Sequence, residues 1–248
     1  LAFIAPGNNP NKLYEPANAR NVISVGGTMK DNGTDLFTGS SHGPTEEGLR
    51  GNFIVTPAVG IVSAAADGNL SSFNENMRSS TGTSSSTALG AGMAAIIQQM
   101  VQENYFIQNG SFTPSGSQLR VLLAMSAESM EGGQQGGEEI GVAPNSLQGW
   151  GRPSLKNLVD NEVWIYDSYQ MNESQRLNLI DEWLDINGTR PLDSMEKKMW
   201  NGTGAQGPFL KNGESVEWNF TLQNNSDLSV FLSFNQRPFG QFSDDLNL

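Results

Sequence analysis

The chain has 248 residues, 37% of them hydrophobic, so it can bury a core and is not globally disordered. Its 26 acidic residues outnumber its 14 basic residues and give a net charge of −12, a field that repels phosphate backbones and excludes nucleic acid as a partner. No run of residues is long and apolar enough to form a membrane-spanning helix.

Residues 1–102 alternate short apolar runs with turns rich in Gly, Ser and Asn. Runs of this length between turn signals are typical of short buried strands. The predicted strands are Phe3–Ala5, Val22–Val25, Phe53–Val55 and Ile61–Ala64.

Two helices are predicted after these strands. The first should bury one continuous apolar stripe, because its large residues recur at helical spacing. The stripe consists of Leu89, Met93, Ile96, Ile97, Met100 and Val101. The second helix is predicted over 117–127, with Leu119, Leu122, Leu123 and Ser126 on one side. Strands that alternate with helices indicate an α/β layer structure.

The character of the chain changes after residue 153. Residues 160–212 are polar, with a short helical pattern near 174–184. From Glu214 onward apolar residues alternate with polar ones, which predicts antiparallel strands of a β domain.

The residue types present restrict the chemistry. The chain has no cysteine, so disulfides, thiol nucleophiles and cysteine-ligated zinc are excluded. It has one histidine, His42, so a mechanism with a histidine base must use that residue or take one from outside this chain.

The most distinctive segment runs from Ser80 to Thr87 and leads into the first predicted helix. One interpretation is a simple helix-capping loop. The other is a nucleophilic serine at a helix start, where backbone N–H groups and the helix dipole would stabilise a developing oxyanion.

Gly82-Thr83-Ser84, with Thr87, Ala91 and Gly92 behind it, resembles the nucleophile motif of the subtilisin-like serine proteases, the subtilases. Phe3–Asn8 is similar to that family's strand and Gly-Asn turn, and segments 16–27 and 40–44 match in the same order. The resemblance implies that Ser84 is the nucleophile and that Asn8 belongs to the oxyanion hole. The alternative for Asn8 is a turn residue beside Gly7.

The resemblance also implies a domain organisation. Gly149-Trp150-Gly151 resembles the segment that closes the catalytic domain in subtilases with an appended jelly-roll domain. We therefore expect the C-terminal part of a parallel-sheet, subtilisin-like α/β domain over 1–159 and an insertion or linker over 160–212. The first part of a β-sandwich is expected over 213–248.

The sequence departs from the family's pattern in the order of its motifs and at two positions of the serine motif. In the family's chain order the Asp and His motifs precede the serine, so both would lie upstream of Leu1. His42 lies in a segment similar to a Ser-Ser-X-Gly-Pro loop and is expected to be a loop residue. Ser85 and Ala88 stand where the family usually has Met and Pro. We expect a fragment whose partner is a missing N-terminal segment carrying Asp and His.

Three functions remain open. The first is a serine endopeptidase that hydrolyses polypeptide substrates through an acyl-enzyme on Ser84, inactive as this chain alone. The second is a catalytically inactive subtilase-like binding or scaffold protein. The third is a surface β-domain protein with a purely structural α/β part.

Cellular location and metal binding are predicted from short sequence patterns. Eight Asn-X-Ser/Thr triplets, beginning at residues 32, 69, 109, 172, 187, 201, 219 and 224, suggest a secreted or extracellular protein, although an Asn-rich composition also produces such triplets. Asp244 and Asp245 resemble part of a turn that lies near calcium in relatives, so a structural Ca²⁺ is expected there; a solvated acidic turn is the alternative.

Overall fold

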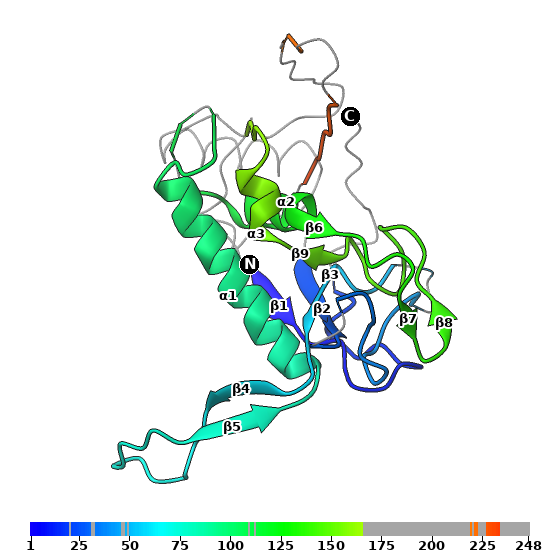
Figure 1. Ribbon diagram of the computed structural model, residues 1–248, viewed down its shortest axis with the longest axis vertical. Coiled ribbons are helices and arrows are strands. Elements are labelled where there is room, and N and C mark those ends of the chain that lie inside the picture. The colour runs from blue at the N-terminus through cyan, green and yellow to red at the C-terminus, as the bar shows by residue number, and fades with distance from the viewer. Residues whose placement is uncertain are drawn as a thin grey trace, which may run out of the picture.

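The computed structural model describes residues 1–165 except 20, 31–32, 46–47, 49, 109 and 112, together with 219, 221–222 and 227–233. Figure 1 shows a small sheet beside one long helix, with a hairpin that projects from the end where this helix begins.

Among the described residues, three parallel strands form the central sheet in the order β1-β2-β3. These strands are β1 (Ala2–Ile4), β2 (Val22–Thr28) and β3 (Ile54–Pro57). Because side chains alternate along a strand, Ile54 joins the core cluster under the helices, whereas Val55 joins a second cluster with Leu36 and Met130. The predicted α/β fold with a parallel sheet is confirmed.

The long helix is α1 (Thr83–Gln102), which contacts all three strands of the sheet. At Gly90, a Cβ atom would lie only 3.3 Å from the Val25 side chain, so the small residue allows the helix to approach the sheet closely. Two further helices, α2 (Gly116–Ser126) and α3 (Leu155–Val159), pack on each other. The predicted buried side of α2 is confirmed, since Leu119, Leu122, Leu123 and Ser126 are all buried.

The apolar stripe predicted for α1 is only partly buried. Ile97 and Val101 are fully buried, but Leu89 is 41% exposed and Ile96 is 47% exposed. The face that contacts the sheet instead contains the small residues Ser86, Gly90 and Ala94. The positions of the large side chains therefore predicted the wrong buried face, because a helix this close to the sheet has room only for small residues there.

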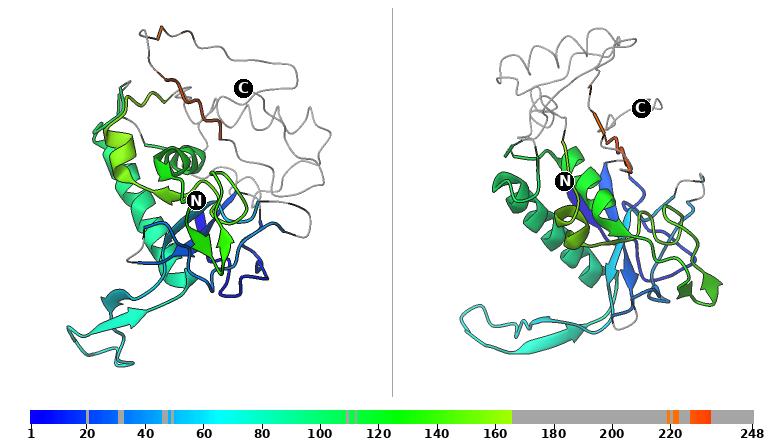
Figure 2. Two further views of the ribbon diagram at one scale, coloured as in Figure 1. Left: turned by 45° about the vertical axis from the view of Figure 1, so that its right-hand side comes forward. Right: turned by 45° about the horizontal axis from the view of Figure 1, so that its top comes forward.

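The prediction of a buried strand at Ile61–Ala64 is wrong about burial. These residues form β4 (Ile61–Ala64), which pairs antiparallel with β5 (Met77–Ser80) in a separate two-stranded sheet. Every residue of β5 is exposed, and the hairpin projects from the body in all views (Figures 1 and 2). β4 pairs with a polar strand, and no described element covers the hairpin, so most of β4 is exposed to solvent.

Short strand pairs complete the described region. They are β6 (Ala127–Glu128) with β9 (Arg152–Pro153), and β7 (Gln134–Gln135) with β8 (Glu138–Glu139). In this part of the chain no helix is long and apolar enough to cross a membrane.

The predictions for 160–212 and for the β domain over 213–248 fall largely outside the described residues. The helical pattern near 174–184 lies wholly outside them. Within 227–233, Phe231 lies 5.6 Å from the Trp150 ring, measured between ring centroids.

Candidate active site

Ser84 lies in the first turn of α1, directly after the hairpin. β5 ends at Ser80, and the helix begins at Thr83 after a turn at Gly82. Gly82 has a φ of 143°, a conformation open almost only to glycine, which explains a glycine at this position. The Ser84 side chain is exposed, so its hydroxyl can meet a substrate.

Asn8 lies beside this turn although 75 positions separate it from Thr83. Its Oδ1 accepts hydrogen bonds from the Thr83 backbone N–H at 2.9 Å and from the Thr83 hydroxyl at 3.2 Å. The Thr83 hydroxyl also lies 3.1 Å from the Gly7 carbonyl oxygen. The structure thus places Asn8 next to Thr83, the residue before Ser84.

The bond to Thr83 fixes which end of the Asn8 amide is available. Only an oxygen can accept from the Thr83 N–H, so the Nδ2 group is the other end of the side chain. A Cβ atom on Gly82 would lie 3.2 Å from this nitrogen. Nδ2 has no hydrogen-bond partner among the residues that the structure describes, and Asn8 is exposed.

The first backbone N–H groups of α1 differ in whether they have a hydrogen-bond acceptor. A helix leaves its first four N–H groups without partners in the helix. Thr83 donates to Asn8, and Ser85 and Ser86 donate to the Gly82 carbonyl at 3.1 and 3.5 Å. Within the described part of the chain this leaves the Ser84 N–H without an acceptor. The free N–H and the positive end of the helix dipole lie at the same residue as the candidate nucleophile.

The remaining hydroxyls fix the helix start to its surroundings. The Ser86 hydroxyl donates to the Thr56 carbonyl oxygen at 3.1 Å, and the Thr56 hydroxyl donates to the Ser86 carbonyl oxygen at 2.7 Å. The Ser85 hydroxyl donates to that of Ser80 at 2.9 Å. The residue at the N-cap, Gly82, makes no side-chain cap. The serine-rich run is therefore not a simple capping loop, since it attaches the helix to β3 and to the hairpin.

His42 is a loop residue. Its Nδ1 lies 2.6 Å from the Gly43 carbonyl oxygen, and the side chain is half-buried. No described histidine or carboxylate makes a hydrogen bond to the Ser84 hydroxyl. The described residues supply a candidate nucleophile and neighbouring donors, but no base in contact with the candidate nucleophile.

The described residues contain no cluster of three or more histidine or carboxylate side chains that could hold a metal ion. The predicted calcium ligands Asp244 and Asp245 lie outside the described residues.

Sequence reasoning missed the part played by Thr83. Its backbone N–H and hydroxyl both hold Asn8, but its only sequence signal was its place before the serine. Nothing in the sequence of Met77–Ser80 indicated the strand that leads into the site.

Parts of this chain are similar to known proteins. The family model described as the subtilase family, peptidase S8, matches residues 1–151. A Dictyostelium discoideum protein named serine protease/ABC transporter B family protein tagB is 25% identical over 230 residues, which are 77% of this chain and 10% of that protein.

Two solved structures are similar in part. The prenylagaramide maturation protease PagA has 20% identity and a TM-score of 0.46, and the match covers 64% of this chain and 49% of that one. The patellamide maturation protease PatA has 23% identity and a TM-score of 0.47, with 63% and 49% covered. The chain thus spans about half the length of these structures and a small part of the curated relative.

Proposed function

The chain belongs to the subtilase family, and from that premise we propose that it is the nucleophile-bearing part of a serine endopeptidase. Its substrates are polypeptides, and the reaction passes through an acyl-enzyme on Ser84. The observation that carries the proposal is the bond from the Thr83 N–H to Asn8 Oδ1, which holds an amide donor beside the start of α1.

In the proposed reaction the Ser84 oxygen attacks the carbonyl carbon of the scissile peptide bond. The carbonyl oxygen becomes an oxyanion, which the Ser84 N–H and the Asn8 Nδ2 group stabilise as donors. The amine leaves with a proton, and water then hydrolyses the ester on Ser84. Both donors are held before the reaction begins, which makes such stabilisation effective.

A serine hydroxyl needs a base to act as a nucleophile near neutral pH. We propose that a histidine and an orienting aspartate come from a part of the protein outside these 248 residues, because His42 is engaged in its own loop. One observation supports this: α1 exposes Leu89, five positions after Ser84, and Ile96 further along the same helix. An added segment that covered this apolar surface would lie next to the nucleophile.

The test is a serine-directed fluorophosphonate probe applied to the protein in the form that its host produces. We expect labelling at Ser84 and none in a Ser84→Ala variant. Ser85→Ala is the matched control, since this neighbouring hydroxyl bonds to Ser80 and should not affect labelling. A protein that folds but takes no label would favour the catalytically inactive binding or scaffold protein.

We propose three further properties: secretion, a structural calcium near Asp244 and Asp245, and a β domain over 213–248. Asn69, which begins one of the glycosylation triplets, is exposed on the hairpin and so is accessible to a glycan. A mass shift of the native protein after enzymatic deglycosylation would support secretion.

A further inference from the structure

The β4–β5 hairpin is an exposed arm that is joined directly to the candidate active site. β5 ends at Ser80, four residues before Ser84. The Ser80–Ser85 hydroxyl bond and the 3.0 Å bond from the Gly60 N–H to the Thr81 hydroxyl fix the base of the arm to the helix start. Anything bound along β5 is therefore held in a defined position relative to Ser84.

The pairing of the hairpin shows which backbone groups are free. The Ala65 N–H donates to the Asn76 carbonyl oxygen at 2.9 Å, so residues in register with this pair exchange hydrogen bonds. In an antiparallel ladder such pairs alternate, which points the N–H and C=O groups of Arg78 and Ser80 toward β4. Those of Met77 and Ser79 therefore point away from β4, toward an edge that no described strand covers.

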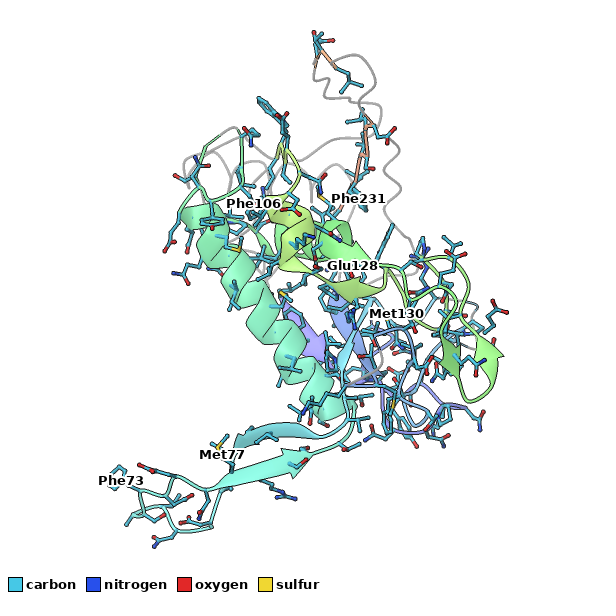
Figure 3. The ribbon with its side chains drawn as sticks, viewed as in Figure 1. Phe73, Met77, Phe106, Glu128, Met130 and Phe231 are labelled. Carbon is cyan, nitrogen blue, oxygen red and sulfur yellow. The ribbon has the colours of Figure 1, made fainter. Side chains whose placement is uncertain are left out.

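The side chains near this edge are unusually apolar for an exposed strand. Met77 is 64% exposed, and Val62, on the same face of the ribbon, is 56% exposed. At the far end Leu70 and Phe73 are wholly exposed; Figure 3 shows Phe73 at the tip and Met77 nearer the body. An open edge beside exposed apolar side chains is the surface on which extended peptides add as strands.

We infer that the outer edge of β5 binds an extended stretch of the polypeptide substrate as an added strand, using the backbone groups of Met77 and Ser79. The inference rests on the proposed function, because it places the scissile bond at Ser84. The substrate is the expected occupant because it is already bound at Ser84. An extended substrate rises about 3.3 Å per residue and so reaches β5 within about four residues of the scissile bond. Substrate residues on one side of the scissile bond would pair with the arm while Val62 and Met77 contact alternate side chains.

The experiment uses the host-produced protein and peptides of two lengths: a short fluorogenic substrate, and the same substrate extended by about six residues at either end. Extension at one end should raise kcat/KM. Ser79→Pro removes one outward N–H of β5, and the matched Ala64→Pro removes one outward N–H of β4, on the opposite edge. Ser79→Pro should lower the kcat/KM of the long substrate about fivefold, the worth of one ordinary hydrogen bond. Ala64→Pro should not, and the short substrate should be unaffected by either change.

Two further measurements separate the alternatives. N-methylation of single amides in the extension tests the pairing without altering the protein, and should lower kcat/KM at alternate positions only. Affinity of the long peptide for the Ser84→Ala protein reports binding without chemistry, and Ser79→Pro should weaken it by the same factor.

The outcomes distinguish this inference from the proposed function. Cleavage of the short substrate without any effect of length, or equal losses in both proline variants, would overturn the strand site and leave the peptidase intact. No hydrolysis, with peptide binding that Ser79→Pro weakens, would overturn the peptidase and leave the strand site. Self-association abolished by Ser79→Pro, without any dependence on peptide length, would identify a second copy of the chain as the occupant and contradict the inference.

Discussion

The two ends of the Asn8 side chain have different partners. Oδ1 accepts from the Thr83 N–H at the start of α1, while Nδ2 lies beside Gly82. A substitution at this position therefore changes both the stability of the helix start and the proposed oxyanion hole.

Comparing Asn8→Asp with Asn8→Ala separates these effects. Asp keeps an oxygen for the Thr83 N–H but loses the amide donor, so we expect kcat to fall about 10²–10³-fold with little loss of stability. Ala loses both, so the same fall in kcat should come with a destabilisation of about 1 kcal/mol. Steady-state kinetics and denaturant unfolding of the host-produced protein measure the two quantities. Equal unfolding midpoints for the two variants would show that the bond to Thr83 contributes nothing to stability.

Gly82 is the second residue of the site that cannot be replaced without cost, because of its backbone conformation. Gly82→Ala should destabilise the protein by about 1–3 kcal/mol, because its φ of 143° is strained for any other residue. The added Cβ would also press on the Asn8 amide, so kcat should fall as well. Gly92→Ala is the control: Gly92 lies within α1 with nothing within 4 Å of its added Cβ, and the change should stabilise by about 0.5–1 kcal/mol. Denaturant unfolding and peptide hydrolysis measure both, and equal stability changes would contradict the strain argument.

At the scale of elements, α2 has a local start signal that can be tested alone. The Ser115 hydroxyl accepts from the Gln118 N–H at 3.2 Å, and the Gln118 side chain accepts from the Ser115 N–H at 2.6 Å, a reciprocal capping box. Ser115→Ala should destabilise the protein by about 1 kcal/mol in denaturant unfolding. Ser154 begins α3 without any side-chain cap, so Ser154→Ala should leave stability within about 0.5 kcal/mol. A similar loss in both variants would mean that the capping box is not the cause.

The sequence predicted some elements well, for physical reasons that differ from one element to the next. The buried side of α2 could be predicted because Leu119, Leu122 and Leu123 leave one direction for burial. For α1 the same reasoning failed, since contact with the sheet depends on small residues such as Gly90, which carry no apolar signal. β5 could not be predicted because its polar residues are exposed and only its pairing with β4 makes it a strand.

For the candidate site, the motif around Ser84 and the Gly-Asn turn at Asn8 pointed to both residues. Their connection through Thr83 could not be predicted, because it depends on a hydrogen bond between distant parts of the chain.

At the scale of the whole molecule, one buried amide joins segments that are distant in sequence. Asn52 is 1% exposed; its Nδ2 donates to the carbonyl oxygens of Ser41 at 3.0 Å and Leu147 at 3.3 Å, and its Oδ1 accepts from the Ser24 hydroxyl at 3.2 Å. It therefore links β2 to two long connections on the side of the sheet away from α1. Polar groups without partners at such a depth are costly.

Asn52→Ala should destabilise the protein by about 3 kcal/mol, because it leaves two carbonyl groups and one hydroxyl without this partner. Ser24→Ala removes one of the same three bonds and should cost about 1 kcal/mol. The ratio of the two losses in denaturant unfolding is the measurement. Equal losses would mean that the links to Ser41 and Leu147 add nothing.

The hydrogen bond between Thr83 and Asn8 has a consequence for the timing of site assembly. The Thr83 N–H, one of the first N–H groups of α1, finds its acceptor in Asn8 Oδ1 and thereby orients the amide of Asn8. An opening that exposes this proton to solvent breaks one of the two hydrogen bonds that orient the Asn8 amide, so the helix start and the proposed oxyanion donor loosen together. The deuterium exchange rate of the Thr83 backbone N–H would therefore report what fraction of the protein molecules has the bond between Thr83 and Asn8 open.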